Sequence, residues 1–69
     1  MEISIKACRN NTGMKQKEFA AAVGVTLNTV SNWERGKTEP SISQLRKIAE
    51  LSGIPFEYIT TGKNSFQMN

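Results

Sequence analysis

Glycine and proline divide this chain into short segments, and that division limits its fold more than any other feature. Gly13, Gly24, Gly36, Gly53 and Pro55 separate the stretches that have helical spacing. These stretches are about eight to twelve residues long, a length at which isolated helices are only marginally stable. No stretch shows a convincing strand pattern or an internal repeat. The sequence therefore predicts an all-α fold whose short helices are held together by tertiary packing.

Five helices are expected from capping residues and apolar spacing. They are expected at about residues 2–11, 15–22, 27–35 and 41–52, with a short fifth helix after Gly53. Gly13 suits a left-handed cap at the end of the first helix. Thr26 suits the N-cap of the third, and Ser41 with Gln44 has the spacing of a capping box. Pro55 fits the first turn of the fifth helix.

The chain has room for one domain. A chain of 69 residues is about half of a typical domain and buries only about 60% of its unfolded surface, so modest stability is expected. We expect the domain at residues 1–61 and a polar tail at 62–69, where no helical period remains. The compact five-helix arrangement is the predicted architecture.

Composition excludes several classes of function. One cysteine, no histidine and no aspartate leave no internal disulfide, no usual zinc cluster and no histidine base. We therefore expect no enzymatic activity, metal, cofactor or small-molecule ligand. A reducing, cytoplasmic location is expected, without a membrane span or signal peptide. The net charge of +3 points weakly to a polyanionic partner.

Residues 16–36 have the features of two helices that cross near a right angle. Ala20 is small enough to let the helices approach closely, and Gly24 can adopt the positive φ that a tight turn requires. Val30 and Trp33 then fall on the inner face of the second helix of the pair. These four residues are therefore expected to pack the pair together.

The opposite face of that second helix is uncharged and polar. It presents Leu27, Asn28, Ser31 and Asn32, with the two asparagines four residues apart and so neighbours. Asparagine can bond adenine at two points in the major groove of DNA, and an apolar group can meet the thymine methyl. By themselves the asparagines are more typical of a solvated surface. Base contact becomes the better interpretation only with the surrounding pattern.

The order and spacing of many residues resemble the phage repressor and Cro-type (XRE) family of helix-turn-helix proteins. The resemblance covers roughly residues 1–61, and it implies a helix-turn-helix made of helices two and three, with helix three in the major groove. The matching residues are Arg9, Met14, Gln16, Glu18-Phe19-Ala20, Gly24-Val25, Thr29-Val30-Ser31, Trp33-Glu34-Arg35-Gly36, Glu39-Pro40-Ser41, Leu45, Ile48-Ala49 and Gly53-Ile54.

The resemblance assigns roles by position. It implies that Leu27, Asn28 and Asn32 read bases, and that Arg9 and Glu34 form a buried ion pair between helices one and three. A further set of polar and basic residues is expected to contact the DNA backbone. These are Gln16, which would also brace the reading helix, Thr26, Thr29, Lys37, Thr38, Lys15 and Arg35.

Three residues depart from the family pattern. Lys15 stands where the family usually has Thr or Ser, so the side-chain cap of helix two is expected to be lost. Leu27 replaces a commonly polar residue, which puts a hydrogen bond at that position in doubt. Pro55 occupies a usual capping position of helix five.

The resemblance further implies a transcriptional regulator, expected to be a repressor that binds a palindromic operator in double-stranded DNA as a homodimer. Phe56, Tyr58 and Ile59 are its candidate dimer contacts, and Phe66 and Met68 of the tail could cover the same interface. Two alternatives stay open. The chain could be an antitoxin that also binds a toxin, or the N-terminal DNA-binding domain of a longer phage repressor.

Overall fold

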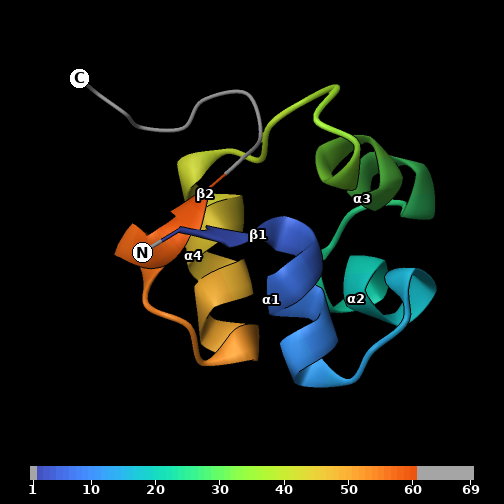
Figure 1. Cartoon of the computed structure of the whole chain (residues 1–69). Helices are drawn as coiled ribbons and strands as arrows, with labels where there is room; N and C mark the ends of the chain where they lie inside the picture. The colour runs from blue at the N-terminus through green and yellow to red at the C-terminus, as the bar shows by residue number, and fades with distance from the viewer. Residues whose placement is uncertain (1, 61–69) are drawn as a thin grey trace.

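The computed structural model describes residues 2–60, so the expected tail at 62–69, with Phe66 and Met68, lies outside the described residues. Four α-helices form most of the described chain, and a short parallel strand pair joins its two ends (Figure 1). In chain order the elements are β1 (Ile3–Ser4), α1 (Ile5–Thr12), α2 (Gln16–Val23), α3 (Leu27–Glu34), α4 (Ile42–Ser52), the 3₁₀ turn η1 (Phe56–Tyr58) and β2 (Ile59–Thr60).

The capping residues identified in the sequence mark the helix ends. The Thr29 N–H donates to Thr26 Oγ1 at 3.2 Å, which caps α3. At α4 the Gln44 N–H donates to Ser41 Oγ at 3.2 Å, and the Ser41 N–H donates to Gln44 Oε1 at 2.7 Å, which completes the capping box. Gly13 ends α1 with a φ of 81°. These local predictions are confirmed.

One apolar core is shared by the four helices and β2. Cys8 belongs to it, as expected from its helical spacing with Ile5, and burial raises the pKa of the Cys8 thiol, while a hydrogen bond with Ser52 acts in the opposite direction. A buried, protonated thiol is poorly reactive. The core residues are Ile5, Cys8, Phe19, Ala20, Val30, Trp33, Ile48 and Ile59.

The end of the described chain differs from the predicted fifth helix. Pro55 precedes a single 3₁₀ turn, and the chain then extends to pair with β1, in the register Ile3 with Ile59 and Ser4 with Thr60. Two-residue strands are too short to show alternation in a sequence, so this pairing was not predicted. Because Ile59 is only 2% exposed, it packs in the core and is not available as a dimer contact.

Candidate nucleic-acid interface

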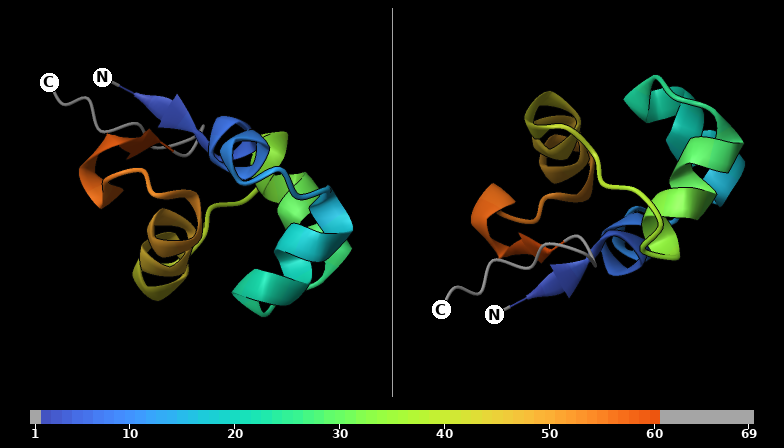
Figure 2. Two further views of the ribbon diagram at one scale, coloured as in Figure 1. Left: turned by 90° about the horizontal axis from the view of Figure 1, so that it is seen from below. Right: turned by 90° about the horizontal axis from the view of Figure 1, so that it is seen from above.

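The helices α2 and α3 lie side by side at the end of the molecule opposite the β1–β2 pair, as two further views show (Figure 2). The turn between them is closed by two hydrogen bonds to one carbonyl: the N–H groups of Gly24 and Val25 both donate to Ala20 O, at 2.8 and 2.9 Å. Gly24 has a φ of 94°, and a Cβ there would meet no heavy atom within 4 Å. Backbone conformation, rather than space, therefore favours glycine at this position.

The two faces of α3 differ sharply in exposure. Val30 and Trp33 are buried in the core, together with Ala20 of α2. Leu27 is 48% exposed, Asn28 is also exposed, and Asn32 is half-buried. The helix therefore turns Val30 and Trp33 inward and leaves an uncharged surface, which includes the apolar Leu27, open to solvent at its N-terminal end. We call Leu27, Asn28 and Asn32 the reading face, after the role that the sequence resemblance implies for them.

A network of side chains centred on Glu34 joins the first three helices. Arg9 Nε donates to Glu34 Oε2 at 2.7 Å, and Arg9 Nη2 donates to Oε1 at 3.2 Å. The same guanidinium donates through Nη1 to the Met14 carbonyl at 3.1 Å, and Gln16 Nε2 donates to Glu34 Oε1 at 2.9 Å. The Arg9 and Glu34 side chains are 13% and 6% exposed. Gln16 therefore connects the start of α2 to the end of α3.

The environment of Glu34 stabilises its charged form. Burial alone would raise the pKa of this carboxyl group. Hydrogen bonds from Arg9 and Gln16, with the positive charges of Arg9 and Lys6, outweigh burial and hold the pKa of Glu34 below its usual value. The ionised carboxylate is therefore the form that ties the three helices together.

This pKa shift predicts a loss of stability in acid. The folded pKa lies below the unfolded value of about 4.3, so the contribution is complete above that value and declines as pH falls through the folded pKa. We expect the free energy of unfolding, measured by urea titration with Trp33 fluorescence, to fall as pH is lowered below about 5. Glu34→Gln should flatten this decline, whereas Glu50→Gln, which removes an exposed carboxylate, should preserve it. An equally steep decline in Glu34→Gln would contradict the assignment.

The residues expected at the DNA backbone lie around α2 and α3, where Gln16 and Thr29 are half-buried and the others are exposed. Lys15 is the N-cap residue of α2, and its side chain forms no capping bond, as expected. Glu18 compensates for the missing cap, which was not predicted, because its Oε1 accepts a hydrogen bond from the Lys15 N–H at 2.9 Å. The hydroxyl oxygens of Thr26 and Thr29 lie 2.9 Å apart at the start of α3.

Beyond α3 the chain turns back against the helix. The Lys37 N–H donates to the Asn32 carbonyl at 2.9 Å, while the Lys37 and Thr38 side chains are exposed. The exposed Arg35 side chain does not extend freely: its Nη2 donates to Asn32 Oδ1 at 3.2 Å. This contact was not predicted, although its three-residue spacing is that of neighbouring positions on a helix.

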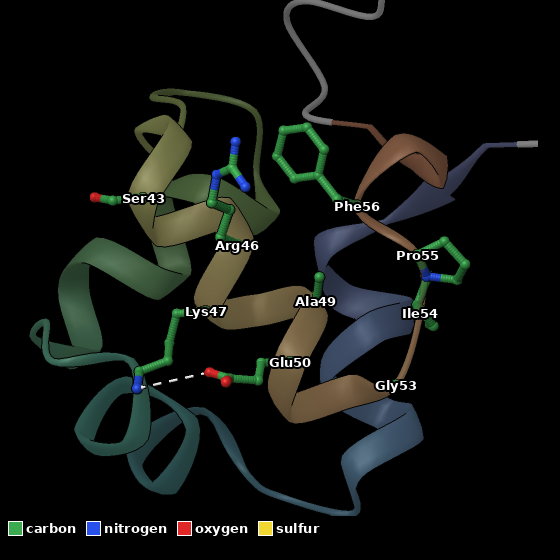
Figure 3. A pocket seen from close by; sticks show the side chains of 9 residues that line it. All are labelled: Ser43, Arg46, Lys47, Ala49, Glu50, Gly53, Ile54, Pro55 and Phe56. Carbon is green, nitrogen blue, oxygen red and sulfur yellow. Dashed lines mark ion pairs between the residues drawn. The ribbon is translucent and has the colours of Figure 1, made fainter.

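A concave surface lies apart from the reading face. An open groove of about 760 Å³ runs between α4 and the segment from Gly53 to Phe56 (Figure 3). The Arg46 guanidinium lies 5.4 Å from the centre of the Phe56 ring, and Lys47 forms an exposed ion pair with Glu50 at 3.9 Å. No residue of α2 or α3 lines this groove. It is therefore a surface distinct from the reading face.

The described part of the chain, residues 2–60, contains no group of three or more histidine, cysteine, aspartate or glutamate residues placed to hold a metal ion. Within the same residues, no helix has the length and apolar character needed to cross a membrane.

Comparison with known proteins identifies the arrangement. The family described as Helix-turn-helix matches residues 5–59. An uncharacterized HTH-type transcriptional regulator of Haemophilus influenzae is 50% identical over 46 residues, which are 67% of this chain and 19% of the relative. The SPbeta prophage-derived uncharacterized HTH-type transcriptional regulator YonR of Bacillus subtilis is 28% identical over 61 residues, 88% of this chain and 56% of the relative.

A further relative is named as an enzyme rather than as a transcriptional regulator. The type II methyltransferase M.SsoII of Shigella sonnei is 36% identical over 55 residues, 75% of this chain but only 14% of the methyltransferase. The likeness therefore concerns one small part of that enzyme. The chain spans 19%, 56% and 14% of the lengths of these three relatives. No solved structure matches the chain.

Proposed function

This chain belongs to the helix-turn-helix family, and from that premise we propose that it binds double-stranded DNA through α3 and regulates transcription. The observation that carries this proposal is the two-sided character of α3. Val30 and Trp33 are buried, while Leu27 and Asn28 are exposed at its N-terminal end. A helix that reads the major groove needs this combination, because its N-terminal residues contact base edges while the rest of the domain holds its direction.

The charges around α3 support the proposal. A carboxylate beside the reading face would repel DNA phosphates, and the only acidic residue of α3 is Glu34. Its charge is matched by Arg9, which lies on the inner side of the same network. The exposed residues nearby include Lys15, Lys37 and Arg35, at the start of α2 and directly after α3. Cations in these places would attract the phosphate backbone, which supplies most of the sequence-independent affinity.

Gln16 is suited to a backbone contact that also fixes the position of α3. Its Nε2 atom donates one hydrogen to Glu34 Oε1. An amide nitrogen carries two hydrogens, so the second remains to donate to a phosphate oxygen. In this proposal Gln16, Lys37 and Thr38 position the domain on the duplex, and Leu27, Asn28 and Asn32 select the sequence.

We further propose that the protein acts as a repressor that binds a palindromic operator as a homodimer. One reading helix contacts only a few base pairs, and a two-fold dimer gains specificity by reading half-sites about 34–36 Å apart. The partly exposed Phe56 lines the α4 groove, and the exposed Tyr58 belongs to the same 3₁₀ turn; these two residues are the proposed contacts. Sedimentation with and without DNA tests this step. A complex that holds a single copy on every selected site would contradict the dimer.

The test of DNA binding compares two classes of variant by gel shifts against a library of sites at several salt concentrations. We expect Asn28→Ala to relax base choice at one position by about 1–3 kcal/mol, because it removes a base contact and no phosphate contact. The slope of log affinity against log salt should then stay nearly unchanged. An equal loss of affinity on every sequence would contradict base reading by Asn28.

Lys37→Met is the matched control, since the Lys37 side chain is exposed and lies outside the reading face. If Lys37 contacts a phosphate, this variant weakens binding to all sequences alike and lowers the salt slope by about one. A changed base preference with an unchanged salt slope in Asn28→Ala, and the reverse in Lys37→Met, would separate sequence selection from attraction to the DNA backbone. Failure of the unaltered chain to bind any duplex at low salt would contradict the proposed function.

A further inference from the structure

The Arg35 side chain contacts a residue of the reading face. Its Nη2 atom donates to Asn32 Oδ1 at 3.2 Å, in a hydrogen bond that is exposed to solvent. Resting on the DNA binding proposed above, we propose that Arg35 is a positioning residue that orients the Asn32 carboxamide and biases α3 toward guanine at the base pair that Asn32 reads. In this inference Arg35 acts on sequence selection through Asn32, in addition to any attraction between its charge and a phosphate.

The backbone after α3 holds Arg35 in place for this contact. The Arg35 N–H donates to the Ser31 carbonyl at 3.0 Å, and the Gly36 N–H donates to the Trp33 carbonyl at 3.1 Å. The Lys37 N–H returns to the Asn32 carbonyl. Three successive amides are thus bonded to the last turn of the helix. A guanidinium in this position is also favoured by the negative end of the helix dipole.

The chemistry of the two groups fixes which way the amide faces. A free asparagine side chain can turn over and exchange its oxygen and nitrogen, so it can present either a donor or an acceptor. A guanidinium has five N–H donors and no acceptor, so only the oxygen of Asn32 can face it. Arg35 therefore excludes the flipped arrangement, and it leaves Nδ2, which is a donor, on the side of the amide that does not face the guanidinium.

This orientation matters for base choice in the major groove. Adenine presents an acceptor and a donor, so an asparagine that bonds it at two points must use its oxygen as well as its nitrogen. Guanine presents two acceptors, N7 and O6. Arg35 already occupies part of the acceptor capacity of Asn32 Oδ1. The group that Asn32 has left for a base is then mainly the donor Nδ2, and a donor matches the two acceptors of guanine better than the acceptor and donor of adenine.

The experiment is an unbiased selection of bound sequences from a random duplex pool. Asn32→Ala first identifies the base pair that Asn32 reads, as the position where preference disappears. The unaltered chain should prefer guanine there. Arg35→Met removes the charge and the donors while keeping side-chain length. It should shift enrichment from guanine toward adenine at that same base pair by about two- to tenfold, the range expected for one hydrogen bond, with the other positions unchanged.

Two further variants separate positioning from other roles. Lys37→Met, which removes a cation that makes no side-chain contact with Asn32, should leave the preferred base unchanged. In the Asn32→Ala background, Arg35→Met should cause no additional change of preference if Arg35 acts through Asn32. Folding of each variant is checked by Trp33 fluorescence, and Arg35 is exposed, so the fold should be kept.

Several outcomes would overturn the inference. They are adenine preferred by the unaltered chain at the Asn32 position, an unchanged base preference in Arg35→Met with uniformly weaker binding, or a further change of preference in the double variant. In contrast, a pool from which the unaltered chain enriches no motif would overturn the proposed function and this inference together. The two failures are therefore distinguishable.

Discussion

Replacing Arg9 by methionine should lower the free energy of unfolding by about 3–5 kcal/mol, because it leaves the Glu34 carboxylate buried without its charged partner. Glu34 is 6% exposed and receives two hydrogen bonds from Arg9. A domain of this size has a total stability of only about 3–10 kcal/mol, so the variant should be close to unfolding. Urea titration at pH 7, followed by the fluorescence of Trp33, the single tryptophan of the chain, measures the change.

Two control variants test the cause of that loss. Lys47→Met breaks the exposed pair with Glu50 and should leave stability nearly unchanged, because surface pairs contribute about 0–1 kcal/mol. The double variant Arg9→Met with Glu34→Leu removes both charges, so it should lose less stability than Arg9→Met alone. If the double variant is the less stable of the two, an unpaired buried charge is not the reason for the loss.

Replacing Phe19 by alanine should cost about 3–5 kcal/mol, because the ring is fully buried and its removal leaves a cavity in the core. Phe19 lies on α2 next to Ala20, so the cavity would loosen the packing that fixes α3 against the rest of the domain. The same urea titration measures the loss. Affinity for DNA should fall with it, because only the folded chain presents α3 to the duplex.

Ile42→Ala is the matched comparison, since Ile42 is also a large apolar residue but is 59% exposed at the start of α4. Its substitution should change the free energy of unfolding by no more than about 0.5 kcal/mol. Equal losses in the two variants would mean that burial does not decide the contribution of these side chains.

The parts of the fold that were predictable depend on chemistry within a few residues. Ser41 with Gln44, and Thr26 before α3, cap helices through side chains three positions apart, so a sequence shows them directly. The turn at Gly24 needs a positive φ, and the glycine itself marks that position in the sequence. The burial of Val30 follows from helical spacing.

The parts that were not predictable depend on distant segments or on side-chain direction. A fifth helix was expected after Pro55, yet the backbone of Ile59 and Thr60 pairs with residues at the other end of the described chain. Nothing local signals such a partner. The contact of Arg35 with Asn32 requires knowledge of how the chain turns after α3. Glu18 lies three residues after Lys15, a spacing visible in the sequence, but its compensation of the missing cap was not predicted.

The β1–β2 pair is expected to form late when the structure assembles. The contacts of α2 with α3 are local, so that pair can form while the chain is still largely extended, and it closes only a short loop. The pairing of Ile3 with Ile59 instead closes almost the whole described chain into one ring, and the entropy cost of closing a loop rises with its length. We therefore expect the strand pair to form late in folding, once the helices have already brought the two ends of the described chain together.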